Sequence, residues 1–79
     1  MPEQHTEPYL YKLEAILSRE RLMTVVVVSS SDEKAFTYAE NQLLRYTVEP
    51  PEIRSLGIVE KKPLGRDGVG YSIETLQFD

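Results

Sequence analysis

Cysteine and tryptophan are absent from this 79-residue sequence, and histidine occurs once, as His5. Without cysteine, the chain has neither a disulfide nor a thiolate zinc site. Its carboxylates lack the histidine or cysteine partners that a transition-metal site usually needs, so we expect no metal and no cofactor. A catalytic set built on cysteine or histidine is also hard to assemble, which favours a non-enzymatic protein.

The sequence also lacks a long apolar run, because its longest purely aliphatic stretch is Val25–Val28. A helix that spans a bilayer needs roughly 20 apolar residues, so no membrane span is expected. The first six residues do not form a basic and then apolar leader, which predicts a cytoplasmic protein. The net charge of -4 argues against a general attraction to nucleic acid.

The composition is that of an ordinary globular protein, with 41% hydrophobic and 28% charged residues. A chain of 79 residues has room for one core. We therefore expect a single domain over residues 1–79, with residues 1–7 as a mobile N-terminal segment. A domain of this size buries a limited share of its surface, so forming a homodimer is one way to add stability.

Two segments in the first third of the chain have the patterns of β-strands. Residues 9–17 place tyrosines and leucines on one face and Lys12 and Glu14 on the other, although a helical stripe also fits part of this segment. Residues 22–29 are rich in β-branched valine and apolar on both faces. A strand open to water on one side should alternate with polar residues, so this segment is predicted to be a central strand.

One amphipathic helix is expected to follow the second strand. Ser30 can cap its first turn while Glu33 reaches back in a capping box, and Asp32 suits the positive end of the helix dipole. Small and apolar residues recur at spacings of three and four from Ala35 onward. The helix should end before Pro50–Pro51, because proline cannot donate the next backbone hydrogen bond.

The last third of the chain predicts two more strands joined by a turn. Residues 52–62 form the third strand, with a change of face around Gly57 that suggests a bulge or close backbone contact. Asp67-Gly68 is a turn signal, and residues 69–76 form the fourth strand. The predicted fold class is α+β, with ββαββ order and a four-stranded, mainly antiparallel sheet packed on one helix. The strand order 1-2-4-3 is preferred because it makes every neighbouring pair antiparallel.

Two motifs invite a phosphate-binding interpretation. Gly65, Gly68 and Gly70 join two predicted strands, whereas a phosphate loop joins a strand to a helix, so a hairpin turn explains them. Ser30 and Ser31 precede the helix, where an anion can bind, but helix capping explains them as well. Capping is the favoured role for these serines, and anion binding stays open.

The tyrosines also allow two interpretations. Tyr9, Tyr11 and Tyr71 lie on predicted strands, and basic residues at positions 61, 62 and 66 could lie beside them. Aromatic and cationic side chains on a sheet can stack single-stranded bases. Tyr9 and Tyr11 share a face with leucines and alanine, however, and this pattern is typical of a core or a protein interface.

Several stretches of the sequence resemble a known family. They are residues 9–14 (Tyr-Leu-Tyr-Lys-Leu-Glu), the strand-to-helix junction over 25–36, and residues 59–63 with the later Gly70-Tyr pair. In these stretches the chain resembles a family of small uncharacterised Bacillus-type bacterial proteins. That family has no assigned activity, so the resemblance implies a bacterial, cytosolic setting and transfers no functional residue.

The leading hypothesis is a small protein-interaction module that forms a homodimer or binds another protein. One helix can cover only one side of a sheet, and an apolar face left open usually marks an interface. We therefore expect contact through the sheet face opposite the helix. The interface candidates are Tyr9, Tyr11, Met23, Val25, Val27 and Tyr71. The alternative is a nucleic-acid or phosphate-binding module that uses the tyrosines with nearby cations, or Ser30 and Ser31.

Overall fold

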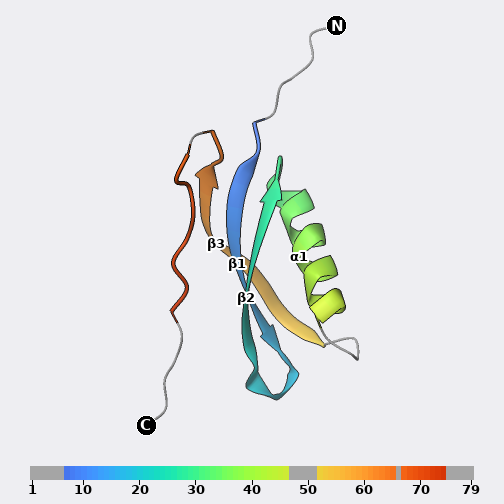
Figure 1. Ribbon diagram of the computed structural model, residues 1–79. Helices are drawn as coiled ribbons and strands as arrows, with labels where there is room; N and C mark the ends of the chain where they lie inside the picture. Colours follow the sequence, from blue (N-terminus) through green and yellow to red (C-terminus); the bar gives the residue numbers. More distant parts are fainter. Residues whose placement is uncertain (1–6, 47–51, 66, 75–79) are drawn as a thin grey trace, which may run out of the picture.

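The computed structural model describes residues 7–46, 52–65 and 67–74, which form one α+β unit (Figure 1). Its elements, in chain order, are β1 (Tyr9–Leu17), a short 3-10 turn (Ser18–Glu20), β2 (Leu22–Ser29), α1 (Asp32–Tyr46) and β3 (Ile53–Pro63). The three strands make one sheet, and α1 packs against one of its faces. The bounds of β1 and β2 are those predicted from the sequence. Within the described ranges, no helix is long and apolar enough to cross a membrane.

β1 is the central strand of the sheet. The strand order is β2-β1-β3, and β1 pairs antiparallel with both neighbours. Leu13 of β1, for example, lies opposite Val25 on one side and Ile58 on the other. β2 and β3 therefore run parallel to each other with β1 between them, and α1 carries the chain from one edge of the sheet to the other (Figure 1).

The prediction of four strands in ββαββ order is wrong, because the described residues form three strands in the order β-β-α-β. Residues 69–74 form no strand, and the last two residues of the predicted fourth strand lie outside the described ranges. The turn at Asp67-Gly68 is present, with Gly68 at φ +86°. After this turn the chain contains Gly70 and Ser72, and neither residue is of a type that is enriched in strands.

The predicted strand order 1-2-4-3, with β2 in the middle, is also wrong. β2 is an edge strand, and only one of its faces is covered. Val25 and Val27 are 7% and 8% exposed, whereas Val26 and Val28 are 40% and 48% exposed. The apolar residues on both faces of β2 predict a strand that is covered on both sides. In the structure, one of these apolar faces is exposed.

The core lies between α1 and the sheet. Its leucines, Leu13, Leu17 and Leu43, are almost completely buried, and burial of such a side chain contributes about 1.5–3 kcal/mol. Ala35 and Ala39 on α1 are also buried, as their helical spacing predicts. Because alanine is small, these two positions let the helix lie close to the strands.

β3 pairs with β1 through two irregularities. The register shifts between Lys12 and Leu13, where Val59 of β3 is skipped, and between Ile16 and Leu17, where Arg54 is skipped. The predicted change of face therefore arises on both sides of Gly57 and not at the glycine itself. Nothing lies within 4 Å of the position that a Cβ of Gly57 would take, so no close backbone contact requires this glycine.

The turn between β1 and β2 is tight. The Leu17 N–H donates to the Arg21 carbonyl at 2.8 Å and closes the hairpin. Within the turn, Arg19 and Glu20 have φ values of 64° and 58°, in the left-handed region that glycine or asparagine adopts most easily. The register between the two strands continues without a shift from this turn to Tyr9.

Candidate interaction surface

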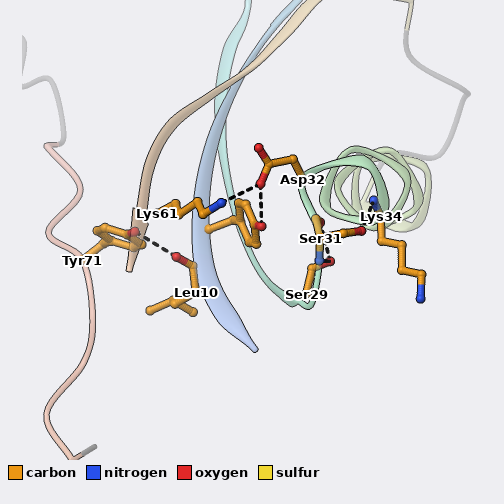
Figure 2. Close-up of polar contacts among 8 residues, drawn as sticks. Leu10, Ser29, Ser31, Asp32, Lys34, Lys61 and Tyr71 are labelled. Atoms are coloured by element: carbon orange, nitrogen blue, oxygen red, sulfur yellow. Dashed lines mark hydrogen bonds and ion pairs between the residues drawn. The ribbon is translucent and has the colours of Figure 1, made fainter. Parts of the chain in front are cut away.

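Most of the interface candidates from the sequence lie beneath α1. The buried ones are Tyr11, Val25 and Val27, and the partly buried ones that pack against the core are Tyr9 and Met23. Residues directly opposite each other in an antiparallel pair point to the same face, so this group continues the helix-covered side from β1 to β2. Tyr71 lies on the other side of the sheet, in the segment that follows the Asp67-Gly68 turn (Figure 2).

Tyr11 belongs to a polar cluster at the start of α1. Its hydroxyl donates to Asp32 Oδ1 at 2.7 Å, and Lys61 Nζ lies 2.9 Å from the same oxygen (Figure 2). The Lys61 ammonium also lies 4.7 Å from the centroid of the Tyr9 ring and 5.5 Å from that of Tyr11. β1, β3 and the first turn of the helix are therefore joined by one acidic, one basic and two aromatic side chains.

The three ionisable groups of this cluster shift one another's pKa values. Burial raises the pKa of Tyr11, and donation of its hydroxyl to Asp32 raises it further. The pKa of Asp32 is lowered by the hydrogen bonds from Tyr11 and Lys61. The bond to Asp32 raises the pKa of Lys61. Near neutral pH, the cluster thus holds a neutral phenol, a carboxylate and an ammonium.

This arrangement occupies the groups that base stacking would use. The ring of Tyr11 is buried, and the charge of Lys61 is paired with Asp32. Lys62 donates to the Gly70 carbonyl at 2.8 Å. The third cation considered from the sequence, Arg66, lies outside the described residues.

The two serines considered as an anion site both lie at the helix entrance, and the cap is Ser31. Its hydroxyl accepts a hydrogen bond from the Lys34 N–H at 3.2 Å, and its carbonyl accepts the first helical bond, from Ala35. The sequence predicted Ser30 as the cap with Glu33 as its capping-box partner, so the true cap lies one residue later. Ser29, which is buried, donates its hydroxyl to the Ser31 carbonyl at 2.8 Å.

The sheet face away from α1 is here called the open face. It carries the alternate residues of β1 and β2, which are Leu10, Lys12, Glu14, Ile16, Leu22, Thr24, Val26 and Val28. The segment 69–74 runs alongside β3 on the side of the sheet away from the helix (Figures 1 and 2) and contacts Leu10 and Lys12 of this face. The open face is therefore divided into a covered half next to β3 and an uncovered half next to β2.

Polar contacts fasten segment 69–74 to the covered half. The Tyr71 hydroxyl donates to the Leu10 carbonyl at 2.9 Å (Figure 2), and Lys12 Nζ donates to the Ser72 carbonyl at 3.1 Å. Lys62 lies with its ammonium 4.4 Å from the centroid of the Tyr71 ring. Burial raises the pKa of Tyr71, and the nearby Glu60 carboxylate raises it further, so the hydroxyl stays a hydrogen-bond donor.

Most side chains of the uncovered half are apolar. Its exposed side chains, together called the β2 patch, are Ile16, Leu22, Val26 and Val28. Leu22 is 62% exposed and Ile16 is 45% exposed, although both sit on strands of a folded sheet. Met23, Val25 and Val27, the β2 residues that the sequence predicts for the interface, lie on the core side of the strand. The β2 patch takes its residues from the alternate positions of the same strand, whose apolar character is also visible in the sequence.

Comparisons with known proteins add a family and no activity. No curated protein and no solved structure matches the chain. In the part of the chain that the structure describes, no group of three or more His, Cys, Asp or Glu residues is placed to hold a metal ion. Residues 8–73 match a family described as protein of unknown function (DUF3906). The match confirms the uncharacterised family predicted from the sequence, and it covers the whole sheet and the helix, so the chain belongs to the DUF3906 family.

Proposed function

We propose that this chain is a small, non-enzymatic protein-interaction module of the bacterial cytoplasm that self-associates through the open face of its sheet. The observation that carries the proposal is the β2 patch. Its apolar side chains come from two adjacent strands and lie on one face, with Thr24 between Leu22 and Val26, beside the segment that covers the β3 half. A contiguous apolar patch on a small protein typically marks an interaction site.

The size of the protein supports self-association. The single helix covers one face of the three-stranded sheet, and the core lies between them. A chain of this length buries a limited share of its surface, so a second surface over the uncovered half of the open face would add apolar burial. A second copy is the one partner that is present whenever the protein itself is present.

The state of the polar cluster supports a non-enzymatic role. A general base or nucleophile works best with a pKa near the operating pH. Here the pKa of Asp32 is moved down and that of Tyr11 is moved up, so both are moved away from neutrality. The cluster therefore acts as a junction between α1 and the sheet.

The test is the oligomeric state of matched variants, measured by sedimentation equilibrium. We expect the wild-type chain to form a dimer and Val28→Glu to raise its dissociation constant at least about tenfold, because the change places a charge in the apolar contact. Leu44→Glu is the matched control, since Leu44 is an exposed aliphatic residue on α1 and not on the open face. It should dimerise like the wild type.

Two results would contradict the proposal. A wild-type chain that stays monomeric up to millimolar concentration would exclude self-association. A Val28→Glu variant that is folded by circular dichroism and dimerises as strongly as Leu44→Glu would show that the open face is not the contact surface.

A further inference from the structure

We propose that β2 pairs edge to edge with β2 of a second copy, in antiparallel orientation, so that two three-stranded sheets become one continuous sheet. This inference rests on the self-association proposed above and gives it a geometry. A different geometry, in which two open faces stack on each other, would also bury the β2 patch. The two arrangements differ in what happens to the backbone at the outer edge of β2.

The outer edge of β2 lacks the charges, prolines and bulges that usually protect an edge strand. Its eight residues, Leu-Met-Thr-Val-Val-Val-Val-Ser, contain no charge and no proline, and its pairing with β1 has no register shift. Natural edge strands are usually short, charged, bulged or covered, because free N–H and C=O groups recruit other strands. An unprotected edge of this length is suited to pairing.

The hairpin bond identifies which backbone groups are free. Since the Leu17 N–H donates to the Arg21 carbonyl and the register is regular, every second residue of the strand bonds toward β1. These inward residues include Met23, Val25 and Val27. The N–H and C=O groups of the alternate residues point away from the sheet, and these residues are Leu22, Thr24, Val26 and Val28.

A two-fold axis at Val25 pairs all four outward residues with one another. In this register Leu22 lies opposite Val28 of the second copy, and Thr24 lies opposite Val26 of the second copy. The outward donors and acceptors are then used on both copies, as an isologous contact requires. On the open face, the β2 patches of the two copies meet along the seam and shield each other from water.

The absence of charge along β2 lowers the repulsion between two copies that meet at this edge. Each chain carries a net charge of -4, so two copies repel each other on average. β2 is the long element without a charged residue, and the proposed register places Leu22 against Val28 and the uncharged Thr24 against Val26. Approach along this strand therefore brings no like charges directly opposite each other.

The surface beside the edge leaves room for a strand. Two adjoining hollows run along the outer side of β2, between the strand and α1, and both include Val26 and Gln42. Tyr38 lines one hollow and Tyr46 lines the other, and both rings are exposed. The axis at Val25 would bring Tyr38 of one copy toward the level of Tyr46 of the other, because these residues lie on opposite sides of Gln42 along α1.

The test uses amide hydrogen exchange of the wild-type chain, followed by NMR at high and at low protein concentration. Edge pairing should slow exchange of the Leu22, Thr24, Val26 and Val28 amides at least about tenfold in the dimer, because their N–H groups become hydrogen-bonded. The inward amides of Val25 and Val27 are the internal control and should be protected at both concentrations.

Cross-linking tests the register. The natural chain has no cysteine, so Thr24→Cys and Val26→Cys each introduce a single thiol. Opposite residues in a hydrogen-bonded pair have Cα atoms about 5.5 Å apart, within the range that a disulfide spans. A mixture of the two variants should therefore form disulfide dimers faster under mild oxidation than either variant alone, whose thiols would be offset along the seam.

The outcomes separate this inference from the proposed function. A wild-type dimer whose outward amides exchange as fast as in the diluted chain would overturn edge pairing and leave self-association standing. A chain that is monomeric at every concentration would overturn both. A mixture of cysteine variants that links no faster than the single variants would overturn the pairing centred on Val25.

Discussion

The two edges of this sheet differ in almost every property that governs strand pairing. β3 carries Arg54, Glu60, Lys61 and Lys62, ends at Pro63, and meets β1 through two register shifts. β2 is uncharged and regular along its whole length. Both flank the same central strand, so the difference comes from their own residues. Charge, proline and irregular register protect an edge from further strands, and only β3 has them.

This asymmetry limits the size of the proposed assembly. When the two β2 edges pair around a two-fold axis, each copy uses its unprotected edge. The edges that remain outermost are then both β3. Because charge, proline and an irregular register protect both of these β3 edges, the sheet does not grow beyond two copies.

The largest expected effect comes from the strand that supports both edges. Leu13 is fully buried in β1 and has a paired residue on each side. We expect Leu13→Ala to lower the free energy of unfolding by about 2–5 kcal/mol through lost burial and the resulting cavity. Urea denaturation at one fixed protein concentration measures this, since dimerisation also contributes to apparent stability. A loss below about 1 kcal/mol would mean that the central strand does not dominate the core.

A smaller effect concerns the ion pair between Lys61 of β3 and Asp32 of α1. β2 has no charged residue and so forms no such pair with the helix. The pKa of Asp32 lies below its usual 3.8, because Tyr11 and Lys61 donate to the carboxylate. A lowered pKa adds stability above the unfolded-state value, and this part is lost as the pH falls through that value toward the folded one.

We therefore expect the wild type to be more stable than Asp32→Asn at pH 6 and this difference to shrink below about pH 4. Thermal unfolding of both proteins across the pH range measures the difference. Glu33→Gln is the control, because Glu33 is the neighbouring exposed acid in the same helical turn. If the two variants lose equal stability with the same pH dependence, the cluster has no special role.

The smallest effect should come from the segment over the covered half of the open face. Tyr71→Phe keeps the ring beside Lys62 and removes the hydrogen bond to the Leu10 carbonyl, which contributes about 0.5–1.5 kcal/mol. The change should speed proteolysis within residues 69–74 and leave dimerisation unchanged. A stronger or weaker dimer in this variant would show that the two halves of the open face are coupled.

Local patterns were enough to predict most elements of this fold. The alternation in residues 9–17 and the valine run fixed β1 and β2 to the residue, and the spacing of Ala35, Ala39 and Leu43 identified the buried stripe of α1. The strand order could not be predicted in the same way. The strand order depends on which strand β3 pairs with after the helix has crossed the sheet, and no residue within β1 specifies that it is β1.

Which residues belong to the candidate surface also depends on the position of α1. The sequence predicts contact through the face opposite the helix, but the tyrosine, methionine and valine residues it names, apart from Tyr71, lie on the face that α1 covers. Tyr11 and Val27 look equally suited to a core or an interface until the position of α1 is known. The link between Tyr11, Asp32 and Lys61 was not predicted at all, since it joins residues from three separate elements.

The central position of β1 also has a consequence for the order in which the chain folds. Its pairing with β2 closes a loop of a few residues, whereas its pairing with β3 joins positions 36 to 54 residues apart, from Leu17–Ile53 to Tyr9–Pro63. Short loops close faster and at a lower entropic cost. We therefore expect a transient β1–β2 hairpin in which the other edge of β1 is still unpaired. Until β3 pairs with that edge, strands of other chains can compete for it. The speed of helix formation, which brings β3 into place, then decides how long this vulnerable state lasts.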